Sequence, residues 1–195
     1  RIFGVSAELD VYLAALVLPL FISNVLGVAF TAVLVPHLIK VRNAEGQETE
    51  AQALRHTFKL ASTTSVIAAI GLVALAPFTV SWVAPYLRSE PTATATARLA
   101  GLLVVTMVLS QVLTAACLVR RRFFIAAVAP ISVPLSIATA AVFFESSPFW
   151  LMAGTLGGHL LVATSLARSL GRDGGLQSGG TRDVQTPFPS AEVVA

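Results

Sequence analysis

Charged side chains are scarce in this sequence of 195 residues. Asp, Glu, Lys and Arg make up 12% of the chain, whereas hydrophobic residues make up 55%, and the mean hydropathy is +0.81. Soluble domains typically carry about 25% charged residues, and one of this size could not bury so much apolar surface. The composition therefore excludes an ordinary soluble core and indicates a membrane protein.

Cysteine and catalytic motifs are nearly absent as well. Cys117 is the single cysteine, and its apolar neighbours favour a packing role over a reactive thiolate. No metal-ligand spacing, nucleophile with a base or glycine-rich phosphate loop is visible. We therefore expect no enzyme activity, no metal and no other cofactor. The net charge of +3 does not indicate a nucleic-acid partner, because its meaning depends on where the basic residues lie.

Long apolar runs dominate the rest of the chain. A helix needs about 20 mostly apolar residues to cross a bilayer, because lipid offers the backbone no hydrogen-bond partner. Five stretches free of Asp, Glu, Lys and Arg meet this length: residues 11–39, 60–87, 99–119, 123–144 and 146–167. The sequence therefore predicts an all-α polytopic membrane protein, with an up-and-down transmembrane helix bundle over residues 1–170.

Prolines interrupt the two longest runs. Pro19 and Pro36 lie in the first, and Pro77 and Pro85 lie in the second. Since proline removes a backbone donor and clashes with the preceding turn, we expect kinks, tilt or early helix ends there.

Basic residues gather in alternate connectors. They are Lys40, Arg42, Arg55 and Lys59 after the first run, Arg120, Arg121 and Arg122 after the third, and Arg168, Arg172 and Arg182 after the fifth. In an up-and-down bundle these connectors lie on one side, which the positive-inside rule makes cytoplasmic. The densest cluster, the three arginines from Arg120 to Arg122, could hold anionic lipid headgroups, although its simplest role is to set the topology.

Two polar segments are predicted to lie outside the membrane. Residues 43–53 are polar and acidic without an apolar period, which predicts a solvated loop leading into the next helix. Residues 171–195 are rich in Gly, Ser, Thr and Pro and have little apolar surface to bury. We expect them to form a disordered cytoplasmic tail.

The opening stretch, RIFGVSAELDVYLAA, resembles the entry to the second transmembrane helix of the MviN/MurJ family of lipid II flippases. The resemblance covers roughly residues 1–170. It continues through Leu18-Pro19, Ala29-Phe30, Val35-Pro36, Ala76-Pro77, Ala84-Pro85, Arg122-Phe123 and Ala129-Pro130.

This resemblance implies helices two to six of a two-lobe exporter fold, so the chain would supply most of one lobe. The chain begins with Arg1 rather than methionine and shows no signal-peptide pattern, and we expect the second lobe of the same protein as its partner. The implied function is transport in the bacterial cytoplasmic membrane. A polyprenyl-pyrophosphate-linked glycan for peptidoglycan synthesis would cross with its headgroup in a central cavity and its chain among the membrane lipids.

Polar residues inside spans are functional candidates, because each costs free energy unless it faces protein or water. Asp10 matches the acidic position of the family motif and could gate the cavity or orient a basic partner, or it could simply favour the helix start. Ser23, Asn24 and Gln111 are candidates to line a substrate cavity, with hydrogen bonding between helices as the plainer alternative.

The chain departs from the family pattern at Ser23 and Asn24. The resemblance implies an arginine at about this point, and a buried arginine would be the natural bidentate partner of a pyrophosphate. Two alternatives therefore stay open: a non-transporting membrane scaffold for cell-wall enzymes, or an exporter of another polysaccharide precursor.

The last run contains a histidine and a set of small residues. His159 could relay protons, but a hydrogen-bonded packing histidine is the favoured interpretation. Gly154, Gly157 and Gly158 are suited to close helix approach and predict a tight helix interface.

Overall fold

The structure, a computed structural model, describes residues 7–85, 90, 92–144 and 147–171. Within these ranges every regular element is a helix. They are α1 (Ala7–Glu45), α2 (Gln47–Val83), α3 (Ala93–Val119), α4 (Phe123–Val128), the 3-10 helix η2 (Ala129–Ile131), α5 (Ser132–Phe143) and α6 (Pro148–Gly171). This confirms the predicted all-α bundle.

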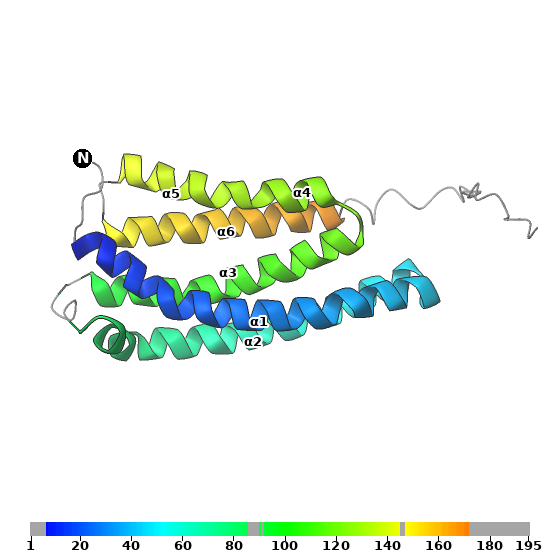
Figure 1. The fold of residues 1–195 in the computed structure, drawn as a ribbon, viewed down its shortest axis with the longest axis horizontal. Helices are drawn as coiled ribbons and strands as arrows, with labels where there is room; N and C mark the ends of the chain where they lie inside the picture. Colours follow the sequence, from blue (N-terminus) through cyan, green and yellow to red (C-terminus); the bar gives the residue numbers. More distant parts are fainter. Residues whose placement is uncertain (1–6, 86–89, 91, 145–146, 172–195) are drawn as a thin grey trace, which may run out of the picture.

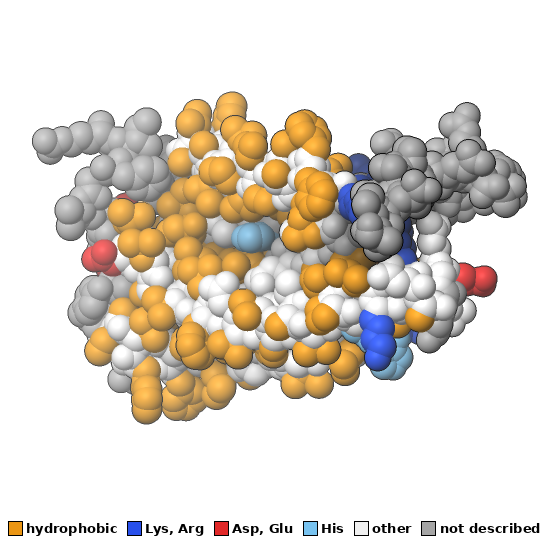
Figure 2. Space-filling model, turned by 45° about the vertical axis from the view of Figure 1, so that its right-hand side comes forward, with side chains coloured by type: hydrophobic (Ala, Val, Ile, Leu, Met, Phe, Trp, Pro, Cys, Tyr) orange, Lys and Arg blue, Asp and Glu red, His pale blue; other side chains and the backbone are white. Residues whose placement is uncertain are grey.

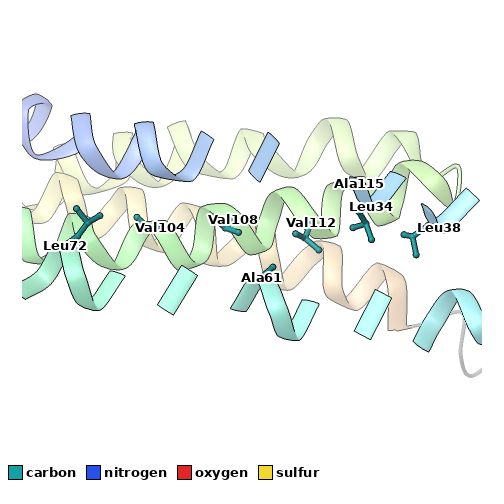
Figure 3. Close-up of a cluster of buried hydrophobic side chains, with 8 residues drawn as sticks. All are labelled: Leu34, Leu38, Ala61, Leu72, Val104, Val108, Val112 and Ala115. Carbon is teal, nitrogen blue, oxygen red and sulfur yellow. The ribbon is translucent and has the colours of Figure 1, made fainter. Parts of the chain in front are cut away.

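Helix α3 forms the core of the bundle. It packs between α1 and α2 on one side and α6 on the other, while α4 and α5 lie against α6 (Figure 1). In α3, 61% of the most apolar 18-residue window is buried, against 11% to 33% in the other four spans. The largest buried cluster joins α3 to the first two helices (Figure 3), and it consists of Leu34, Leu38, Ala61, Leu72, Val104, Val108, Val112 and Ala115.

The outer helices carry their apolar side chains on the surface. Phe124 is 81% exposed and Trp82 is 88% exposed, and hydrophobic side chains cover most of the face between the two ends of the bundle (Figure 2). Among the described residues, five spans are long and apolar enough to cross a membrane. Side chains of this kind are stable on the surface only where lipid replaces water, so the bundle is a membrane domain.

The connection between the first two spans differs from the prediction. Residues 43–53 do not form a solvated loop: α1 continues to Glu45 and α2 begins at Gln47, with Gly46 alone between them at φ 88. A single glycine suffices for this reversal because it adopts a positive φ without steric cost. The prediction of a loop was wrong because it treated the lack of an apolar period as evidence against a helix. The Ala, Glu and Gln residues of this segment favour a helix even where they are exposed to water.

Prolines interrupt the helices at one place only within the described residues. Helix α1 runs through Pro19 and Pro36, and α2 runs through Pro77 and ends at Val83, before Pro85. The break comes in the fourth span, where the 3-10 helix containing Pro130 separates α4 from α5. Each proline leaves the carbonyl oxygen four residues before it without a helix hydrogen bond. The first two spans can keep these prolines because α1 and α2 pack along α3, and neighbouring helices compensate for the lost bond.

Two of the three glycines predicted to form a tight interface, Gly154 and Gly158, lie at a close contact between α6 and α5, whereas Gly157 does not. A Cβ on Gly158 would lie 2.6 Å from the Cα of Val133, and one on Gly154 would lie 2.8 Å from the Cβ of Ala140. The hydroxyl of Ser132 donates across the same interface to the Gly158 carbonyl oxygen at 3.2 Å. These contacts hold α5 and α6 together without a large apolar core, which is how helices associate in lipid.

Part of the predicted polar tail, residues 172–195, lies outside the described residues, as do residues 1–6 of the opening motif. Gly171, the first residue of the predicted tail, is the last residue of α6.

The α5–α6 contact gives a matched pair of substitutions. Gly158→Ala places a methyl group against the backbone of α5 and should lower the free energy of unfolding by about 1–3 kcal/mol. Gly157→Ala meets only the Ser136 hydroxyl at 3.5 Å, an ordinary contact, and should be neutral or slightly stabilising because alanine favours helix. Thermal unfolding of the purified protein in detergent, followed by tryptophan fluorescence, compares the two. Equal losses would contradict the proposed tight contact.

Candidate functional site

The polar residues in the middle of the bundle lie on α1 and α3. The Nε2 of Gln111 donates to the Ser23 carbonyl oxygen at 3.3 Å, and its amide lies directly over Gly27, where a Cβ would come 2.0 Å from Oε1. The Ser23 side chain is fully buried, and its hydroxyl has no partner among the described atoms. The structure therefore brings two of the predicted cavity residues together through one helix crossing.

Asn24 lies on a different face of α1. It is exposed, although its sequence neighbour Ser23 is fully buried, because successive residues on a helix point about 100° apart. Asn24 is close to the midpoint of the predicted span 11–39, so its amide would face hydrocarbon unless water or another part of the protein covers it. This makes the exposed face of α1 around Asn24 the strongest candidate for the wall of a polar cavity.

Asp10 lies apart from these residues. It is half-buried in the first turn of α1, which carries Glu8 as well, where two acids favour the positive end of the helix dipole. Near it, the Tyr12 hydroxyl bonds to Oγ1 of Thr155 at 2.9 Å, a buried contact that joins α1 to α6. Whether Asp10 also acts on a substrate stays a prediction.

His159 differs from the favoured interpretation. Its Nδ1 is buried and has no hydrogen-bond partner among the described residues, so it is not the hydrogen-bonded packing residue expected from the sequence. It follows directly on Gly158, the closest point of the α5–α6 contact. Its backbone position is therefore fixed even though its Nδ1 lacks a partner among the described residues.

The opposite end of the bundle brings the three basic connectors together, as the topology predicted (Figure 1). Glu50, in the first turn of α2, lies where two of these connectors meet, and its side chain is only 1% exposed. Its Oε1 accepts from Nε of Arg120 at 2.9 Å, and its Oε2 lies 3.7 Å from Nε of Arg42. The Nη1 of Arg42 also donates to the Val119 carbonyl oxygen at the C-terminus of α3, at 3.1 Å.

Sequence analysis missed Glu50, because the acidic stretch around it was taken as a solvated face. A carboxylate this deeply buried is stable only when it is paired, and both of its partners come from basic connectors. One feature of the sequence could have indicated this pairing. Glu50 lies within one of the basic connectors that were predicted to meet at one end of the bundle, where an acid would find basic partners.

The three arginines of the α3–α4 turn have different surroundings. Arg120 pairs with Glu50, whereas Nη1 of Arg122 donates to both the carbonyl oxygen and the hydroxyl of Ser169, near the end of α6. Arg121 is exposed and has a positive φ of 57. The predicted cluster is therefore two structural arginines with one outward-facing arginine between them.

A family model described as "Lipid II flippase MurJ" matches residues 1–170 of the chain. The chain belongs to this family. The match confirms the resemblance found in the opening motif and in the proline positions, and it covers every described helix up to the last residue of α6. No curated protein sequence gives a significant match.

Membership of the MurJ family gives the protein its general role and place. The family consists of flippases, which are transporters rather than enzymes, and it acts on lipid II in peptidoglycan biosynthesis. With five helices able to span a membrane in the described part of the chain, the protein is a multi-pass protein of the bacterial cytoplasmic membrane. At Ser23 and Asn24, where the resemblance implied a departure from the family pattern, only Asn24 is exposed.

The buried ion pair at Glu50 gives the second prediction. Glu50→Gln leaves Arg120 and Arg42 without an anion and should lower the free energy of unfolding by about 1–3 kcal/mol. Arg120 and Arg42 are 19% and 36% exposed, so water compensates part of the loss. Glu48→Gln, an exposed acid in the same helical turn, is the control and should change stability by less than about 0.5 kcal/mol. Thermal unfolding in detergent measures both variants. A similar change in melting temperature for the two would contradict a stabilising role of the buried ion pair.

Proposed function

We propose that α1, supported from behind by α3, forms part of the wall along which the headgroup of a lipid-linked glycan crosses the membrane. The cargo is a polyprenyl-pyrophosphate glycan of the lipid II type, moved from the cytoplasmic to the outer leaflet while its hydrocarbon chain stays in lipid. The family match supports this class of cargo. The observation that carries the proposal is Asn24, an exposed amide near the middle of a membrane span.

The amide of Asn24 suits a sugar, although its exposed neighbours one turn away, Phe21 and Val28, are apolar. Asn24 offers a carbonyl oxygen and two N–H donors, which match the hydroxyl and acetamido groups of a glycan. Behind it, Gln111 holds α1 against α3 through the Ser23 carbonyl oxygen, so the backbone that presents Asn24 is fixed from the buried side. In this arrangement Asn24 contacts the headgroup, whereas Gln111 and Ser23 position α1.

Asn24→Leu should slow flipping about tenfold, the factor that a loss of about 1.4 kcal/mol produces, with little effect on stability. The measurement is the exposure of fluorescently labelled lipid II on the outer leaflet of liposomes that contain the full-length protein. Thr139→Val is the control, because Thr139 is exposed on α5 and, among the described residues, its hydroxyl bonds only to the Leu135 carbonyl oxygen of its own helix. Its flipping rate should match the wild type.

Gly27→Ala tests the supporting contact separately. The added methyl group overlaps the Gln111 amide and must displace it, but only the end of a flexible side chain has to move. We expect slower flipping with a folded protein.

The outcomes separate the alternatives left open by the sequence. Failure of the wild type to flip any polyprenyl-pyrophosphate glycan would favour a membrane scaffold that does not transport, whereas normal flipping of lipid II by Asn24→Leu and by the double variant Ser23→Leu/Asn24→Leu would contradict the proposed role of this wall. Absence of lipid II flipping by the wild type, with flipping of a different polyprenyl-pyrophosphate glycan in the same liposomes, would favour export of another polysaccharide precursor.

A further inference from the structure

The turn between α3 and α4 has the hydrogen bonds of a Schellman motif. The Arg122 N–H donates to the Cys117 carbonyl oxygen at 2.8 Å, and the Arg121 N–H donates to the Leu118 carbonyl oxygen at 3.0 Å. In this motif the residue after the C-cap takes a left-handed conformation and is usually glycine. Here that residue is Arg121, at φ 57, where a side chain with a Cβ costs roughly 1 kcal/mol relative to glycine.

The conformation directs the three arginines differently. Arg120 and Arg122 bond to Glu50 and Ser169, and together they fix the turn to α2 and α6. Arg121 is exposed, and no described residue forms an ion pair or hydrogen bond with its guanidinium. The turn therefore presents one arginine outward from a rigid frame.

The residues that follow Arg121 identify the surroundings of its side chain. Phe123 and Phe124 begin α4 and are 59% and 81% exposed, and the fourth membrane span starts at Phe123. The start of the span places both rings in the outermost turn of the hydrocarbon region, and Arg121, two residues before Phe123, lies just outside it. Arg121 is thus held at the depth of the lipid phosphates.

We propose that Arg121, flanked by Phe123 and Phe124, binds the phosphodiester of an anionic phospholipid of the bilayer. The planar guanidinium binds a phosphate through two parallel N–H donors, while the two rings rest among the acyl chains just below. The ligand is a structural lipid of the membrane rather than the transported cargo, so the proposal stands independently of the flipping pathway.

Other basic residues at this end, including the exposed Lys40, Arg55, Lys59 and Arg168, also attract anionic lipid. Their effect is diffuse and follows total charge. If Arg121 forms a specific site, its removal should release more bound anionic lipid than the removal of any one of these other charges.

The test measures lipid retained by the full-length protein in native mass spectrometry, with phosphatidylglycerol and phosphatidylcholine as probes. Arg121→Gln should lower retention of phosphatidylglycerol more than about tenfold, as the loss of charge-assisted hydrogen bonds predicts, whereas Arg168→Gln, with the same change in charge, should lower it no more than about fivefold. Retention of phosphatidylcholine should not change in either variant. Equal losses in the two variants would show diffuse attraction and overturn the site.

Arg121→Gly tests whether a loss of lipid is caused by misfolding. Glycine suits the left-handed backbone, so this variant should melt at a higher temperature than the wild type and still lose phosphatidylglycerol. Retention of the lipid by the glycine variant, or a lower melting temperature, would overturn the proposal. Displacement of phosphatidylglycerol by millimolar inorganic phosphate would show a site for free anions instead, and would overturn the assignment to a lipid.

Discussion

The absence of water from the hydrocarbon core is the constraint on which the rest of this structure depends. Lipid cannot form hydrogen bonds with backbone N–H and C=O groups, so these groups must bond to one another. In this bundle each span does so by forming a helix. The absence of water also removes the usual hydrophobic drive for helices to associate. The helices are held instead by close fit, as where Gly154 and Gly158 admit the backbone of α5, and by a few buried polar contacts, such as Tyr12 with Thr155.

Charge is concentrated where the helices leave the membrane, and there it has two functions. Glu50 draws Arg120 and Arg42 inward, which ties the α1–α2 turn to the end of α3. A buried pair of this kind contributes less to stability than its short distance suggests, since both ions lose hydration, but it defines how the connectors meet. Arg121 remains exposed beside these pairs. The same short turn thereby fixes the bundle and leaves one cation directed at its surroundings.

The sequence predicted those features that depend on position along one helix. Span number, the side shared by the basic connectors and the small-residue contact at Gly154 and Gly158 all follow from periodicity and length. Features that depend on the meeting of distant segments were not predicted. The meeting of the basic connectors predicts that an acid pairs there, but not whether it is Glu50 or its exposed neighbour Glu48, because the partner Arg120 lies 70 positions away. Ser23 and Asn24 likewise look equivalent in the sequence, and only the packing of α3 assigns them to different faces.

The distribution of polar groups also restricts how this part of the protein can treat a pyrophosphate cargo. Residues 11–39, 99–119 and 146–167 contain no lysine or arginine, so the wall formed by Asn24 offers amide dipoles without a formal positive charge. Amides hydrogen-bond well to sugar hydroxyls, but they do not offset the charge of a pyrophosphate in a medium of low dielectric constant. On this physical ground the glycan is the part of the cargo that α1 is suited to contact. The cation that balances the pyrophosphate must then come from outside these spans, either from another part of the protein or from an ion that accompanies the cargo.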